Sequence, residues 1–171
     1  MPPRPPRRRP ARPVADAPVA ALVARAEDLA KGWLVALIEE QPLARASSIR
    51  ADELARDGPA ICELLVRSLA SDAELARVAE GVEPLPCVGE LAGAHTAEEV
   101  SRAVEALRAV LWSALLAALP EADATLVADL AERLAVVCEP VRGAAGRPRF
   151  LDQDVVNSGN LELLLTAQSR S

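Results

Sequence analysis

The chain of 171 residues is poor in aromatic side chains, with two tryptophans, one phenylalanine and no tyrosine. Sheet proteins are usually rich in aromatic and β-branched residues, whereas this chain is rich in alanine and leucine, which favour helices. Apolar residues nevertheless make up 51% of the sequence, so a chain of this length can bury a core of useful size. The composition therefore predicts a single compact all-α domain.

Residues that carry chemistry are also scarce, since the chain has one histidine and three cysteines. An odd number of cysteines without a CxxC spacing argues against a disulfide framework and favours the reduced thiols of a cytosolic protein. Cys62 and Cys138 fall in apolar helical stretches and are expected to be small core residues. Cys87 lies in a loop rich in glycine and proline, where we expect exposure.

Three kinds of site could use His95, which precedes a predicted helix. A Ser-His-Asp triad lacks any Gly-x-Ser-x-Gly context, and a zinc site with Cys87 would need two more ligands from distant segments. A haem ligand would lie within a helix. The sequence also has no Walker or GxGxxG loop and no Glu-x-x-His pattern. We therefore expect His95 to be a surface residue beside Thr96.

From these absences we predict a protein that is not an enzyme, with no catalytic, metal-binding or cofactor-binding residues. The alternative that stays open is a helical metal-, haem- or thiol-dependent protein that uses His95 or Cys87.

Long apolar runs are absent as well. None approaches the ~18 residues that cross a bilayer, and the first residues lack the apolar segment of a secretory signal. We therefore expect a soluble cytoplasmic protein without a membrane partner.

Charge is distributed unevenly along the chain. The formal net charge is −6, but the first 15 residues carry five arginines and no acid, which leaves −11 on the remainder. An acidic body repels the phosphate backbone, so binding of nucleic acid through it is not expected. Residues 1–15, rich in proline and arginine, are predicted to form a disordered arm. This arm is either a solvated leader or a contact for nucleic acid, an acidic membrane or a reader of PxxP segments.

The clearest positive signal is an apolar stripe in residues 17–40, held at helical spacing for more than six turns. Its members are Val19, Leu22, Val23, Ala26, Leu29, Ala30, Trp33, Leu34, Leu37 and Ile38. The stripe predicts one long helix that ends near Pro42, with a face that packs against helices of this chain or of a partner.

Two short helices are expected next, over residues 49–56 and 60–69, separated by a break at Gly58 and Pro59. The capping-box sequence Ser71–Glu74 predicts the start of another short helix. Residues 81–93 are expected to be irregular.

Two further long helices are predicted after this irregular stretch. One follows the capping box Thr96–Glu99 and is stopped by Pro120, and the other follows Asp123 and ends near Pro140. The predicted fold is thus a bundle of three long helices and several short ones in residues 16–142. Residues 143–171 are predicted to form a linker and a loosely ordered tail.

A family resemblance adds to this interpretation. Residues 33–40 read WLVALIEE, residues 49–59 read IRADELARDGP, residues 61–65 read ICELL and residues 103–112 read AVEALRAVLW. Together these segments resemble the amino-terminal domain of RsbR-type co-antagonists, the RsbRD family, over about residues 17–142. The resemblance implies a globin-like fold, usually without haem, that dimerises. It also implies a position before an output domain such as a STAS domain, a PucR-like regulator, a histidine kinase or a diguanylate cyclase. We recognise no output module in this sequence.

The resulting hypothesis is a non-enzymatic regulatory or sensory domain that forms a homodimer and controls an output domain or a protein partner in stress or second-messenger signalling. A change in helix packing would pass along residues 124–141. An adaptor bundle that binds another regulatory protein is the alternative within this class. The expected core or interface anchors are Trp33, Leu37, Leu107, Leu111 and Trp112.

Overall fold

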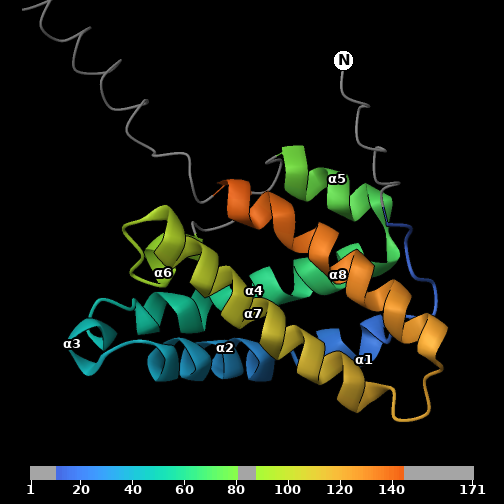
Figure 1. Ribbon diagram of the computed structural model, residues 1–171, viewed down its shortest axis with the longest axis horizontal. Helices are drawn as coiled ribbons and strands as arrows, with labels where there is room; N and C mark the ends of the chain where they lie inside the picture. Colours follow the sequence, from blue (N-terminus) through green and yellow to red (C-terminus); the bar gives the residue numbers. More distant parts are fainter. Residues whose placement is uncertain (1–10, 81–87, 145–171) are drawn as a thin grey trace, which may run out of the picture.

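The computed structural model describes residues 11–80 and 88–144, which contain eight helices and no strand (Figure 1). The helices are α1 (Val19–Val23), α2 (Ala26–Glu40), α3 (Leu43–Ala46), α4 (Ala51–Ala70), α5 (Asp72–Glu80), α6 (Val88–Leu91), α7 (Ala97–Ala118) and α8 (Ala124–Ala144). The prediction of an all-α bundle is confirmed. Within the described ranges, no helix is both long enough and apolar enough to cross a membrane.

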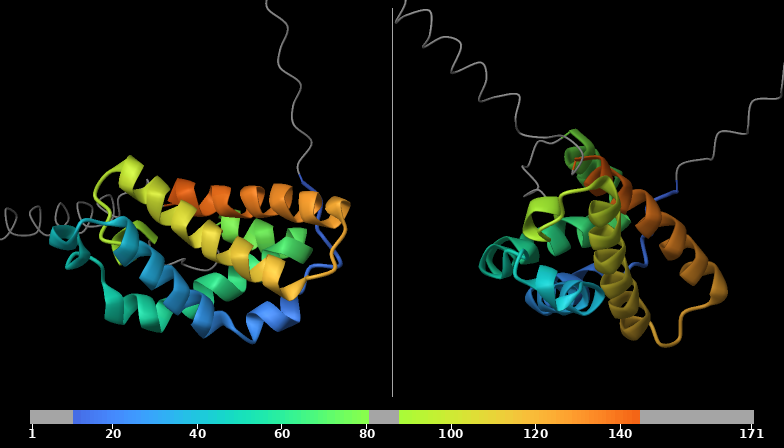
Figure 2. Two further views of the ribbon diagram at one scale, coloured as in Figure 1. Left: turned by 60° about the horizontal axis from the view of Figure 1, so that its bottom comes forward. Right: turned by 60° about the vertical axis from the view of Figure 1, so that its left-hand side comes forward.

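Helix α4 lies at the centre of the bundle and contacts α1, α2, α5, α6 and α8. Helix α7 packs against α2 and α8, and the left view of Figure 2 shows it crossing between α8 on the upper side and α1 on the lower side. The end of α2, all of α3, α6 and the start of α7 gather at one end of the molecule (Figure 1). Segments far apart in the sequence therefore meet at that end.

The core is one continuous cluster of buried apolar side chains that draws on α1, α2, α4, α6, α7 and α8. Its largest member is Trp33, which is fully buried and whose indole Nε1–H donates to the backbone carbonyl of Ala103 at 3.1 Å. Cys62 and Cys138 are buried in this core, as predicted, and burial raises the pKa of each thiol to about 12. Both thiols are therefore protonated at neutral pH.

The expected single helix over residues 17–40 is wrong in one respect, because α1 and α2 are separated at Ala24 and Arg25. The backbone N–H of Arg25 donates to Leu22, one residue closer than in an α-helix, so the chain tightens there. Leu22 and Leu29 are buried on either side of this turn. The apolar stripe thus predicted the buried face correctly, although the helix is interrupted.

The expected break at Gly58 and Pro59 is also wrong, since α4 runs through both residues. Proline removes one backbone hydrogen bond and ordinarily costs about 3 kcal/mol inside a helix. Leu54 and Ile61 are buried on the two sides of Pro59, and their burial offsets this loss. The bundle consequently has four long helices, α2, α4, α7 and α8, where three were expected.

Helix α8 likewise passes through Pro140, where the sequence predicted its end, and continues to Ala144. Val137 and Val141 are buried on either side of the proline, so the same offset applies. Within residues 81–93, expected to be irregular, Val88–Leu91 form α6. Residues 81–87, which include Cys87, lie outside the described residues.

The ends of the predicted domain differ slightly from the structure. Ala11 and Val14 contact the body: the carbonyl of Ala11 accepts from Arg133 at 2.8 Å, and Val14 is buried and its N–H donates to the carbonyl of Leu69 at 2.9 Å. The packed part therefore begins within the expected arm. Residues 1–10 and 145–171, on which the rest of the arm and tail predictions fall, lie outside the described residues.

The predicted caps of α7 and α8 are present, and of the capping box predicted at Ser71–Glu74 the bond from the N–H of Glu74 to the hydroxyl of Ser71 is present, at 3.3 Å. The α7 capping box is complete, because Glu99 N–H donates to the hydroxyl of Thr96 and the Glu99 carboxylate accepts from Thr96 N–H. Asp123 accepts from the N–H of Leu126 at 2.7 Å at the start of α8. Such caps satisfy backbone donors that have no partner within the helix.

Candidate functional site

A pocket of about 360 Å³ opens where the end of α2, α3 and the start of α7 meet. This volume lies at the small end of the range for ligand sites in proteins. Leu37 of α2 and Ala103 of α7, both buried, form its apolar floor. Its rim carries Glu40, Gln41, Pro42, Arg45, Ser48, Gly93, Ala94, His95, Thr96, Glu99 and Arg102.

The floor of the pocket is part of the contact between α2 and α7. The backbone carbonyl of Ala103 accepts the hydrogen bond from the Trp33 indole, which lies one helical turn before Leu37 on α2. A molecule seated on this floor therefore touches both helices next to their buried hydrogen bond.

The loop before α7 is fixed against the turn that follows α3. Gly93 has φ +64°, and a Cβ built there would lie 2.4 Å from the carbonyl oxygen of Ser48, so only glycine fits. The Gln41 side chain donates to the carbonyl of Ala92 at 3.3 Å, and the N–H of Arg50 donates to the carbonyl of Leu91 at 3.0 Å. These bonds hold the two walls of the pocket in place.

Glu99 joins α3 to the start of α7. Its carboxylate accepts from the backbone N–H groups of His95 at 2.8 Å and Thr96 at 3.1 Å, and from the guanidinium of Arg45. The hydrogen bond from His95 is the largest cause of a lowered Glu99 pKa, and the bond from Thr96 and the nearby Arg45 charge act in the same direction. Glu99 is therefore a carboxylate at neutral pH.

Arg102 lies one turn further along α7 and also lines the pocket. Its guanidinium is 3.6 Å from the carboxylate of Glu98, beyond ordinary hydrogen-bond distance, and the Glu98 side chain is 83% exposed. An exposed pair of this kind is weak. Arg102 thus brings an almost uncommitted cation to the pocket.

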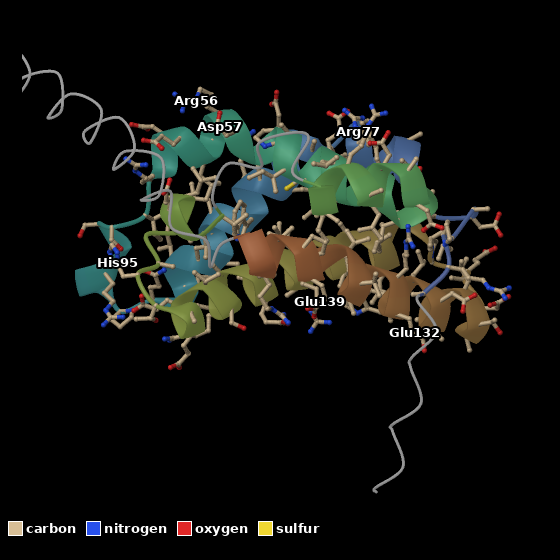
Figure 3. All side chains as sticks on the ribbon, turned by 90° about the horizontal axis from the view of Figure 1, so that it is seen from above. Arg56, Asp57, Arg77, His95, Glu132 and Glu139 are labelled. Carbon is tan, nitrogen blue, oxygen red and sulfur yellow. The ribbon has the colours of Figure 1, made fainter. Side chains whose placement is uncertain are left out.

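His95 is exposed beside the Thr96 cap, as the sequence predicted, and Figure 3 shows it at the end of the molecule where α3 lies. His95 lines the rim of the pocket, and its backbone N–H donates to the carboxylate of Glu99. Nowhere in residues 11–80 and 88–144 do three His, Cys, Asp or Glu side chains gather in an arrangement that could hold a metal ion.

Four of the five anchors predicted from the sequence are buried in the core of this chain. Trp33, Leu37, Leu107 and Leu111 are at most 2% exposed, and Trp112 is half-buried against the core. Only Leu37 among them also lines the pocket.

Sequence reasoning missed the pocket residues Arg45 and Arg102. The sequence identifies Glu99 as a capping residue, which places it in the first turn of a helix. It does not predict the bond between Glu99 and Arg45. Arg45 and Glu99 are 54 positions apart, so no local pattern connects them.

A second charged residue that the sequence did not single out is Arg133 of α8, which is 1% exposed. Its guanidinium donates twice to the carbonyl of Ser68, at 3.0 and 2.8 Å, and once to that of Ser71 at 3.1 Å. It also donates to the carbonyl of Ala11 at 2.8 Å and the carboxylate of Asp72 at 2.7 Å. Arg133 therefore satisfies the carbonyls at the end of α4 and ties the N-terminal segment to them.

The Arg133 network and the pocket differ in the number of hydrogen-bond donors that they leave free. Arg133 has all its donors engaged within the protein, whereas the pocket at the end of α2 and α7 is hollow and keeps free donors. The pocket is therefore the candidate functional site. Comparison of the chain with protein-family models, curated proteins and solved structures finds no match.

Proposed function

We propose that this chain is a non-enzymatic regulatory or sensory helical domain, whose input is a small molecule bound in the pocket between α2 and α7. The observation that carries the proposal is the position of the pocket floor, which is formed by Leu37 and Ala103 within the packing contact of the two helices. The resemblance of residues 17–142 to RsbR-type sensory domains supports the same class of function.

The mechanism is a shift in helix packing. A ligand favours whichever arrangement of α2 and α7 it binds more tightly, and interdigitated helices move by small steps when one arrangement is favoured. Helix α8 packs against α7, so a shift of α7 displaces residues 124–141 of α8. These residues make up most of the last described helix. From there the shift would act on an output domain or on a protein partner in stress or second-messenger signalling.

Homodimerisation is part of the proposal. The outer surface of α2 offers apolar side chains for it: Val35 and Ile38, three residues apart on one helix face, are 52% and 44% exposed. Because α2 also forms one wall of the pocket, a ligand would act on the same helix that contacts the second copy.

A fragment screen by thermal unfolding tests the ligand site. We expect some fragments to raise the unfolding temperature of the full chain, since a ligand at 100 times its Kd stabilises a protein by about 2.7 kcal/mol. Ala94→Phe places bulk in the pocket and should abolish these shifts. Ala128→Phe, the same change at an exposed position of α8, should leave them intact.

Hydrogen exchange of the full chain with the best fragment tests the mechanism. The proposal expects slower exchange of backbone amides in both α2 and α7. It is contradicted if fragments stabilise the Ala94→Phe protein as strongly as the original, or if binding changes exchange in neither helix.

A further inference from the structure

We infer that the ligand of this pocket is a small organic anion, a carboxylate with an apolar body of a few carbons. This inference rests on the proposed function and names the chemical class that the site takes. It follows from a count of which polar groups on the pocket wall are already engaged within the protein.

Three of the four polar side chains that are neither arginine nor carboxylate make hydrogen bonds within the protein, and the fourth, His95, is exposed on the rim. The Gln41 amide donates to the carbonyl of Ala92, and the Ser48 hydroxyl donates to the carbonyl of Arg45 at 2.6 Å. The Thr96 hydroxyl accepts from the N–H of Glu99 in the capping box. These bonds fix the pocket, and the capacity they leave (the O–H of Thr96, one N–H and the oxygen of Gln41, and the lone pairs of Ser48) carries no charge.

Glu99 is engaged as well. Its two carboxylate oxygens accept from two backbone N–H groups and from Arg45, so it does not call for a cation on the ligand. The carboxylate that stays uncommitted on the wall is Glu40, at the exposed end of α2.

Among the charged groups of the pocket, the open hydrogen-bonding capacity therefore belongs mostly to donors. A guanidinium has five N–H donors in a planar fork that matches a carboxylate. Among the described residues Arg102 makes no hydrogen bond and only the long contact to Glu98, and Arg45 uses one nitrogen for Glu99. A ligand carboxylate can reach the Arg102 fork at the rim while its apolar part covers Leu37 and Ala103 on the floor.

Calorimetric titration of the full chain with matched acids and amides tests this inference. The probes are benzoate and hexanoate, their neutral amides, and acetate, which lacks the apolar body. We expect each larger acid to bind about tenfold or more tightly than its amide, the value of a hydrogen bond to a charged group. Acetate should bind more weakly than hexanoate, because it leaves the floor uncovered.

Three variants locate the effect. Arg102→Gln should remove the preference for acid over amide. Arg108→Gln, on the same helix and paired with Glu105 away from the pocket, should keep it. Glu40→Gln should strengthen acid binding, since Glu40 is the like charge on the wall.

The outcomes separate this inference from the proposed function. If amides bind as well as acids, or if Arg102→Gln binds acids as well as the original chain, the ligand class is wrong while the pocket remains a ligand site. If acids are outcompeted in the pocket by cationic fragments, the ligand class is again overturned. If neither these probes nor any fragment binds in the pocket, the proposed function falls with it.

Discussion

Arg133 and Glu99 are single charged side chains that each hold several segments of the chain together. Arg133 joins the end of α4 to α8 and to the segment before α1, and Glu99 joins α3 to the start of α7. They differ in burial, because Arg133 is 1% exposed and the Glu99 side chain is 19% exposed. Their removal should therefore have different consequences.

Replacement of Arg133 by methionine should lower the free energy of unfolding by about 3 kcal/mol, because it leaves the buried carbonyl of Ser68 and the carbonyl of Ser71 at the end of α4 without a donor. Urea denaturation measures this loss. The matched control is Arg67→Gln on α4, which removes an exposed pair with Glu63 and should cost under about 0.5 kcal/mol. Equal costs for the two variants would show that the buried network contributes nothing of its own.

Glu99 should make stability depend on pH. Its pKa is lowered in the folded protein, chiefly by the hydrogen bond from His95, so folding favours the carboxylate. The stabilisation is present above the pKa of the unfolded chain and is lost as the pH falls through the lower folded pKa. We expect Glu99→Gln to be less stable than the original chain at neutral pH, with the difference closing in acid.

Urea midpoints measured across the acid range check this expectation. Glu98→Gln, at the exposed neighbouring position, is the control and should follow the original chain closely. A Glu99→Gln deficit that stays constant with pH would contradict the assignment to the charge.

At the scale of single helices, the apolar pattern predicted which faces are buried more reliably than where helices stop. The stripe of residues 17–40 faces the core on both sides of the turn at Ala24 and Arg25. Proline predicts a helix end at positions 59 and 140, yet α4 and α8 continue through both. Local rules omit the burial on either side, which only the packed bundle supplies.

Gly58 lies where α4 crosses α2, and the closeness of the two helices explains why a glycine stands at this position. A Cβ there would lie 3.1 Å from the Cβ of Ala30 and 3.3 Å from a methyl of Leu54. Alanine usually stabilises a helix relative to glycine, but here we expect Gly58→Ala to cost about 1–3 kcal/mol because two backbones are forced apart. Thermal or urea unfolding measures the change.

Gly32→Ala is the matched control in α2. Its added Cβ would meet chiefly a methyl of Val110, at 3.2 Å, and a side-chain end can move aside more easily than Ala30 can. We expect Gly32→Ala to be clearly less costly than Gly58→Ala. The reverse order would mean that the crossing at Ala30 is not the tight one.

At the scale of the whole molecule, the core is built by this chain alone. Leu107 and Leu111 are covered by other helices of the same chain. Their burial therefore does not require a partner. Any homodimer must use side chains outside this core.

Leu107→Ala tests this view of the core. We expect it to lower the free energy of unfolding by about 2–5 kcal/mol, as buried leucines do, to the same extent at every protein concentration. Urea unfolding over a wide range of protein concentration measures both quantities. A loss that shrinks as the protein is concentrated would instead place Leu107 at an interface between copies.

The fold class, the helix caps and most of the buried faces could be predicted from the sequence, because each depends on residues close together in the chain. The pocket could not be predicted, because its lining combines residues that are far apart in the sequence. Leu37 and Ala103 form its floor, and Arg45 and Arg102 lie on its rim. Arg133 and Ala11 are 122 positions apart, so their hydrogen bond could not be predicted for the same reason. Only the path of the chain through space brings such residues together.

The central claim is that a molecule in the pocket alters the contact between α2 and α7, and the indole N–H of Trp33 reports on that contact directly. We predict that titration of the full chain with hexanoate shifts the Trp33 indole signal in a proton–nitrogen NMR spectrum, with Trp112 as the internal reference. In the Arg102→Gln protein the same shift should require about ten times as much hexanoate. A Trp33 signal that does not move while the pocket is saturated would contradict the account.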